Sequence, residues 1–142
     1  MRKRLWDKLR KDKPLLVIGS PMCTDWSSMM CLNWPKMKEE EIAARMKAAR
    51  MHLKFCTQVY RYQADSSRHV LHEHPSAARS WKEPTMKKLT RMQDNMVAKA
   101  DRCQYGRLVE DAPGKALAKK PNNFSLHCAT AKENVRRSAI GC

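Results

Sequence analysis

A short apolar run followed by a long amphipathic helix is the feature that most limits how this chain can fold. The run, at residues 15–18, reads Leu-Leu-Val-Ile and stops at Gly-Ser-Pro, which is typical of a strand buried on both faces of a parallel sheet. Between residues 36 and 63, apolar side chains recur every three or four positions, which predicts one continuous helix. A second strand, over residues 69–74, ends at Pro75. This order predicts a right-handed crossover between parallel strands.

The rest of the chain adds helices and a third strand. Residues 2–11 have helical spacing, with apolar side chains among basic ones. Residues 76–93 read as a second helix that restarts at Pro84, because proline suits the first turn of a helix. Residues 95–101 predict a third strand. The segment 107–123 is rich in Gly, Pro and Lys, and we expect an exposed basic loop there.

The composition indicates an anionic partner and a small core. The 142 residues include 29 Lys and Arg against 14 Asp and Glu, a formal net charge of +15, which favours nucleic acid. Val, Ile, Leu and Phe supply only 22 residues, so we expect one modest domain or a fragment of a larger fold. The chain shows no signal peptide and no run of the ~18 apolar residues that a membrane helix needs. Its six cysteines lack paired zinc-site spacing. We therefore expect an intracellular protein with reduced thiols, nuclear or cytoplasmic.

Reactive side chains stand at both strand ends. Cys23 follows the first strand, and Glu73 lies at the end of the second. Because ligands of open parallel sheets bind beyond the carboxyl ends of the strands, we expect both groups at one edge of the sheet. Side-chain alternation places Glu73 on the opposite face from His72 and His74. Each group also has a plainer interpretation: Cys23 as a small buried residue, and Glu73 as a carboxylate paired with a lysine.

Three segments around these strand ends form a recognisable series. They are residues 18–27 (Ile-Gly-Ser-Pro-Met-Cys-Thr-Asp-Trp-Ser), residues 70–75 (Val-Leu-His-Glu-His-Pro) and residues 100–106 (Ala-Asp-Arg-Cys-Gln-Tyr-Gly). In this order they resemble the Pro-Cys nucleophile loop, the strand ending in Glu-Asn-Val and the later Asp-Tyr-Gly segment of the DNA cytosine-5 methyltransferases. The pattern also resembles methyltransferase-like modules of retroelement-type polyproteins.

The resemblance implies a mechanism and a set of residues. Cys23 would be the nucleophile that adds to the cytosine ring, and Glu73 would bind a ring nitrogen and stabilise the adduct. S-adenosylmethionine would donate the methyl group, and the base would be flipped out of the DNA duplex into a pocket. The substrate-binding residues implied are Ser20, Pro21, Thr24, Trp26, Ser27, Gln104 and Tyr105.

The chain also departs from the family's pattern. Met22 replaces the proline that precedes the nucleophile, and His74-Pro75 replaces Asn-Val. No Gln-x-Arg-x-Arg signature follows residues 100–106. The family's S-adenosylmethionine loop is Gly-rich and lies upstream of the cysteine, where this chain has a single glycine, Gly19. We therefore expect that this chain alone neither binds the cofactor nor transfers a methyl group.

Two groups of side chains keep two interpretations. Trp26 and Trp34, near the cysteine loop, either stack on a base or pack in a hydrophobic layer, the commoner role of tryptophan. The basic side chains of the long helix form either a solvated face or a DNA contact. They are Arg45, Lys47, Arg50 and Lys54.

These observations predict an α/β domain with a partial, Rossmann-like parallel sheet of about three strands and flanking helices. We expect a basic N-terminal segment at 1–12, a methyltransferase-like domain at 13–125 without the cofactor-binding start, and a C-terminal tail at 126–142. The first hypothesis is a truncated or degenerate DNA cytosine methyltransferase-like domain. The alternative is a non-catalytic, basic nucleic-acid-associated module of a mobile-element polyprotein. Histidines in a strand-end motif more often form hydrogen bonds than bind metal, so we expect no metal ion.

Overall fold

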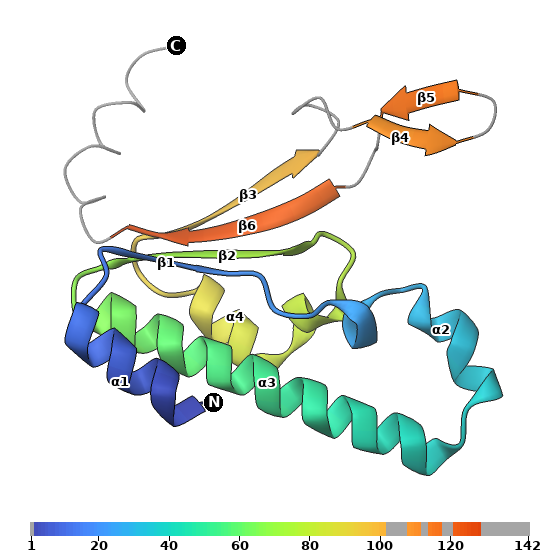
Figure 1. Ribbon diagram of the computed structural model, residues 1–142, viewed down its shortest axis with the longest axis horizontal. Coiled ribbons are helices and arrows are strands. Elements are labelled where there is room, and N and C mark those ends of the chain that lie inside the picture. The colour runs from blue at the N-terminus through green and yellow to red at the C-terminus, as the bar shows by residue number, and fades with distance from the viewer. Residues whose placement is uncertain (1, 102–107, 112–113, 118–120, 129–142) are drawn as a thin grey trace.

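The protein has a sheet layer and a helix layer, and helices α1, α3 and α4 lie on one face of the sheet in the computed structural model (Figure 1). The structure describes residues 2–101, 108–111, 114–117 and 121–128. The strands are β1 (Leu16–Gly19), β2 (His69–Pro75), β3 (Asn95–Asp101), β4 (Leu108–Asp111), β5 (Gly114–Leu117) and β6 (Pro121–His127). The helices are α1 (Arg2–Asp12), α2 (Met30–Asn33), α3 (Glu39–Asp65) and α4 (Pro84–Thr90), with 3-10 turns η1 (Thr24–Trp26), η2 (Trp34–Lys36) and η3 (Arg79–Lys82).

The sheet is mixed and has the strand order β1-β2-β6-β3. The predicted strand–helix–strand unit is confirmed, because β1 and β2 are parallel neighbours and α3 connects them. Strand β6 runs antiparallel to both of its neighbours, β2 and β3. The prediction of an α/β fold is therefore confirmed, but a purely parallel sheet is not what forms.

The expected basic loop over 107–123 is wrong, because this stretch contains β4, β5 and the start of β6. Strands β4 and β5 pair with each other as a separate hairpin (Figure 1). In β6 the buried side chains are polar: Asn122, Ser125 and His127. The usual sign of a half-buried strand is an apolar residue at every second position. In β6 the most buried positions are polar, and only half-buried Phe124 and Leu126 show this apolar alternation.

Helix α3 carries most of the core. It has 27 residues and begins with three consecutive glutamates, which is favourable at the positive end of the helix dipole. Leu53, Val59 and Tyr60 of this helix are at most 5% exposed, and they share one core cluster with residues of α1, β2 and α4. Leu9 of α1 belongs to that cluster, so the basic N-terminal helix packs on the same core.

The opposite face of the sheet is open at β1. Leu16 is 44% exposed and Ile18 is 65% exposed, whereas Val17 packs against the core. The expectation that this strand is buried on both faces is wrong. An uninterrupted apolar run does not reveal whether helices cover one face of a sheet or both, and α1, α3 and α4 cover only the face that carries Val17 and Val70 (Figure 1).

Candidate functional site

The carboxyl ends of β1 and β2 lie side by side. The register pairs Gly19 with His72, so the next residues along the two strands, Ser20 and Glu73, are neighbours. The Ser20 hydroxyl donates a hydrogen bond to Oε2 of Glu73 over 2.5 Å, a length typical of a hydroxyl bound to a carboxylate. This contact joins one of the predicted substrate-binding residues to the predicted catalytic carboxylate.

A cavity of about 340 Å³ opens on the uncovered sheet face at this contact. That volume lies within the roughly 300–1,000 Å³ of small-molecule sites. Its polar lining comes from Ser20, Glu73 and Asn122, and the rest is apolar. Asn122 is 2% exposed, and its Oδ1 has no hydrogen-bond partner among the described residues. Such a buried, unpaired acceptor costs about 1–3 kcal/mol.

Sequence reasoning missed Asn122, because it lies in the stretch expected to be a basic loop. The cavity also includes Ile18, Leu71 and Phe124, from three adjacent strands. The alternation of Asn122, Phe124 and Leu126 is the signal that could have placed these side chains on one face of a strand.

The loop that carries Cys23 is fastened to β2 by a buried histidine. Nε2 of His74 lies 3.1 Å from the carbonyl oxygen of Pro21, and Nδ1 lies 2.5 Å from the Ser80 hydroxyl. A carbonyl can only accept, so Nε2 carries the proton, and Nδ1 of the neutral ring accepts from Ser80. His74 is 1% exposed and Ser80 is 0% exposed. These hydrogen bonds fix the backbone two residues before Cys23.

Burial keeps the two strand histidines neutral. His72 is fully buried, and its pKa is lowered to about 3, chiefly by desolvation and further by the neighbouring His74. The pKa of His74 is also lowered by burial, although its hydrogen bond to Pro21 and the charge of Glu73 oppose the shift. Nδ1 of His72 lies 3.1 Å from the hydroxyl of Tyr60, whose own pKa is raised by burial. These rings act as structural, uncharged hydrogen-bonding groups.

The space beside Gly19 is filled by Tyr60. A Cβ atom at this glycine would lie 1.7 Å from the Tyr60 hydroxyl oxygen, so the glycine is required for α3 to approach β1. Glycines at the end of a strand can instead leave room for a nucleotide cofactor. At Gly19 that room is occupied by Tyr60.

The other predicted site residues differ in their burial and in their contacts. Cys23 is half-buried, has no disulfide partner and directly precedes η1. Thr24 is exposed, and Ser27 accepts a hydrogen bond from the backbone N–H of Met29 over 3.2 Å. Pro21 is buried. The predicted residues Gln104 and Tyr105 lie outside the described part of the chain.

Both tryptophans near the loop have protein partners. Trp26 is 2% exposed and belongs to the hydrophobic core, so its ring packs inside the domain and does not lie on the open sheet face as a platform for a base. This agrees with the packing interpretation of Trp26. The Arg79 guanidinium lies 4.3 Å from the ring centroid of Trp34, which is a cation–π contact.

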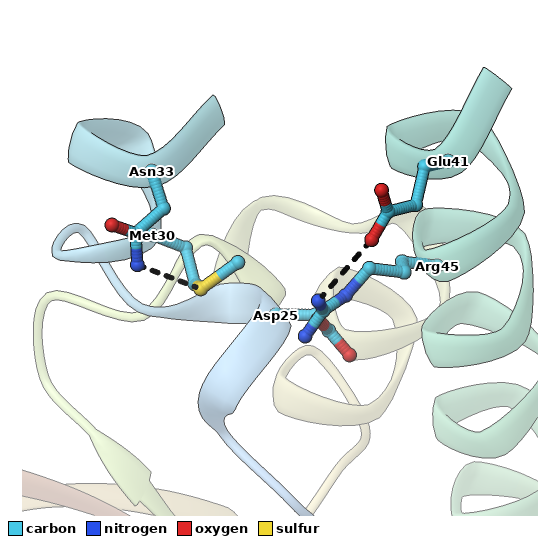
Figure 2. A network of polar contacts seen from close by, with 5 residues as sticks. All are labelled: Asp25, Met30, Asn33, Glu41 and Arg45. Atoms are coloured by element: carbon cyan, nitrogen blue, oxygen red, sulfur yellow. Dashed lines mark hydrogen bonds and ion pairs between the residues drawn. The ribbon is translucent and has the colours of Figure 1, made fainter. Parts of the chain in front are cut away.

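A network of ion pairs also connects the loop that carries Cys23 to α3. Figure 2 shows Arg45 of α3 between Glu41 and Asp25, with Nε 3.0 Å from Oδ1 of Asp25 and Nη1 4.0 Å from Oε1 of Glu41. In the same view, the side-chain amide of Asn33 lies 3.9 Å from the sulfur of Met30. Because the Arg45 side chain is 41% exposed, these ion pairs position the loop more than they stabilise the fold.

Comparison of the chain with protein-family models, curated proteins and solved structures finds no match. Within the described residues, no helix is both long and apolar enough to cross a membrane. The same part of the chain contains no group of three or more His, Cys, Asp or Glu side chains that could hold a metal ion. The site therefore has to be interpreted from its own chemistry.

Proposed function

We propose that this chain is a degenerate, DNA cytosine methyltransferase-like domain of Rossmann-like fold that binds nucleic acid without methylating it on its own. In this proposal one unpaired base enters the cavity at Glu73. The observation that carries the proposal is the hydrogen-bonded pair of Ser20 and Glu73, which lines a cavity of small-molecule size at the carboxyl ends of two parallel strands.

The cavity lining suits the edge and faces of a base. Glu73 offers carboxylate oxygen acceptors, and the exocyclic amino group of cytosine supplies two N–H donors. Phe124 and Leu71 give apolar surface for the ring. A base must leave its stack to enter, at a cost of a few kcal/mol that is least for a single strand. We therefore expect single strands to bind better than duplexes.

Cys23 supplies the nucleophile in this proposal. Its thiolate sulfur would bond to C6 of the cytosine ring, and the displaced electron pair at C5 would take up a proton. This addition is reversible and requires no methyl donor. The hydrogen bond from His74 to Pro21 fixes the backbone two residues before Cys23. Cys23 is not among the described residues that line the cavity, so the thiol would have to reach the bound base from the adjoining loop.

We expect no methyl transfer because the segment before Cys23 contains a single glycine, Gly19, where the family has a Gly-rich cofactor loop. Titration calorimetry of the chain with S-adenosylmethionine is expected to give no binding heat. A saturable binding curve would contradict this part of the proposal while leaving the base-binding part intact.

Base binding is tested with labelled single strands that carry either one cytosine or an abasic position at the same place. A hydrogen bond to a charged group contributes about 1.5–3 kcal/mol, so we expect the wild type to prefer the cytosine strand by about tenfold or more. Glu73→Gln is expected to remove most of this preference. Glu40→Gln, which removes the same charge at an exposed position of α3, should retain it. Equal preference in all three proteins would refute the role of Glu73.

The second candidate function is a non-catalytic, basic nucleic-acid-associated module of a mobile-element polyprotein. It is favoured by a cluster of cations between α3 and α4, well away in sequence from Cys23. The two functions differ in a covalent test with DNA that contains a pyrimidin-2-one base, whose ring accepts a thiol at C6. Under the first proposal the wild type and Cys56→Ala form a covalent complex, and Cys23→Ala does not. Under the second, none of the proteins does, while salt-sensitive DNA binding persists.

A further inference from the structure

Helices α3 and α4 enclose a basic groove. Its cavity measures about 580 Å³. Among the described residues, its lining includes four cations, Lys54 and Arg61 from α3 and Lys88 and Arg91 from or next to α4, and no acidic side chain. All four cationic residues are exposed. Such a concentration of positive charge in a concave surface attracts polyanions more strongly than the same charges spread over a convex one.

The cations stand along both sides of the groove. Lys54 and Arg61 are seven residues apart, two helical turns or about 10 Å along one side of α3. Lys88 and Arg91 are three residues apart, which places them on one side of the chain across the groove. Arg61 lies 3.9 Å from Asp65, but both side chains are more than 60% exposed, so this ion pair is too weak to neutralise the groove.

Neutral hydrogen-bonding groups lie between the cations. Thr57, Gln58 and Thr85 also line the cavity, and hydroxyl and amide side chains are, with Arg and Lys, the usual contacts of phosphate oxygens. Beneath them Leu89 is 5% exposed and belongs to the core, which gives the groove a fixed floor. Two of the other basic residues of α3 are engaged elsewhere: Arg45 with Asp25, and Arg50 with Glu83.

We propose that this α3–α4 groove binds the phosphate backbone of a nucleic-acid strand. The inference relies on the partner class of the proposed function but concerns a different surface. The groove is lined by residues of or next to α3 and α4, whereas the Glu73 cavity is lined by strand residues. Helices α3 and α4 lie on one face of the sheet (Figure 1). Among the described residues, the groove offers positive charge and neutral hydrogen-bonding side chains. It therefore fits phosphates of any base sequence and supplies affinity without sequence specificity.

The expected magnitude follows from counterion release. For a single strand, the logarithm of the binding constant falls by about 0.7 per phosphate contact for each tenfold rise in salt. Four contacts therefore give a slope of about −2.8, and removing two of them leaves about −1.4. At 0.1 M salt the loss of two contacts corresponds to about 25-fold weaker binding, by the same relation taken from 1 M.

The test uses a labelled strand of abasic deoxyribose phosphates, which engages the groove but offers no base to the Glu73 cavity. Fluorescence anisotropy across a salt series compares the wild type with Lys88→Gln/Arg91→Gln. The matched control is Lys8→Gln/Lys99→Gln, which removes two exposed charges that do not line the groove. We expect the groove variant to bind about 25-fold more weakly at 0.1 M salt with a slope shallower by about 1.4, and the control to stay within about twofold of the wild type.

The proposal is overturned if both double variants lose the same affinity, because net charge alone would then explain binding. It is also overturned if the wild type does not bind the abasic strand, or if polyglutamate of equal charge competes as well as the strand does, which would indicate an acidic peptide as the occupant. Glu73→Gln is expected to bind the abasic strand like the wild type. Failure of the base-binding proposal and failure of the groove proposal are thereby distinguished.

Discussion

Replacing His72 tests the electrostatics of the strand that carries Glu73. The His72 side chain is fully buried in contact with Tyr60 and Trp81, with ring centroids 5.5 Å and 5.2 Å away. Burial lowers its pKa to about 3, against about 6.5 in an unfolded chain. Between these two values the unfolded chain binds a proton at this position and the native protein does not. The free energy of unfolding therefore falls as the pH falls below about 6.5, and His72 contributes no pH dependence above that value.

The size of the effect follows from the same two values. Each pH unit below about 6.5 removes about 1.4 kcal/mol, so the loss attributable to His72 is about 1.4 kcal/mol at pH 5.5 and about 2.7 kcal/mol at pH 4.5. His72→Gln keeps a polar side chain but removes the titrating ring. The variant is expected to lose about 2.7 kcal/mol less stability than the wild type between pH 7.5 and pH 4.5, whatever its absolute stability.

The assay is urea denaturation followed by tryptophan fluorescence at several pH values for both proteins. His52→Gln, at an exposed position of α3, is the matched control and should follow the wild-type pH dependence. Parallel curves of unfolding free energy against pH for the wild type and His72→Gln would refute the assignment of a neutral, buried His72.

Two further changes test how the site is held together. Gly19→Ala places a Cβ against the Tyr60 hydroxyl, so we expect the free energy of unfolding to fall by about 1–3 kcal/mol. Thermal unfolding measures this loss, which should be smaller in a Tyr60→Phe background. An unchanged melting temperature would contradict the close packing. Ser80→Ala leaves Nδ1 of His74 buried without its donor, which is expected to lower the free energy of unfolding by about 1–3 kcal/mol. The control, Ser28→Ala at an exposed position, should change it by no more than about 0.5 kcal/mol. Equal effects of the two substitutions would show that the hydrogen bond between Ser80 and His74 is not formed.

The elements with a strong local signal are those that the sequence predicted. The apolar repeat of α3 indicated a helix over 36–63, and the helix spans 39–65. The third strand was predicted over 95–101, the range that β3 occupies. Each of these segments has its own periodicity or clear end signals, so its structure follows from neighbouring residues in the chain.

The elements that escaped prediction depend on distant partners. Strand β6 places Ser125 at a buried position, where its hydroxyl donates a hydrogen bond to Oδ1 of Asn95 on β3; a polar residue is acceptable there only because of such a partner in the folded sheet. The open face of β1 likewise depends on where the helices pack. No local pattern distinguishes an exposed Ile18 from a buried one.

The candidate site, too, was predicted only in part from the sequence. Parallel neighbouring strands sufficed to predict that the carboxyl ends of the first two strands lie at one edge, where Ser20 and Glu73 form a hydrogen bond. That Cys23 also meets Glu73 there stays a prediction. The anchoring of Pro21 by His74 and Ser80 was not foreseen, since alternation gives the face of a side chain but not its partner. Asn122 was missed together with its strand.

The most direct test of the account is to titrate 2′-deoxycytidine into isotope-labelled protein and follow the backbone amide resonances. The account predicts that the largest shifts occur on three adjacent strands, at Ile18 and Ser20, at Leu71 and Glu73, and at Asn122 and Phe124, the residues around the cavity. Glu73→Gln should reduce them, and Glu40→Gln should not. Shifts confined to the helix layer, or no saturable shift at these positions, would contradict the claim that the strand ends form a base-binding site.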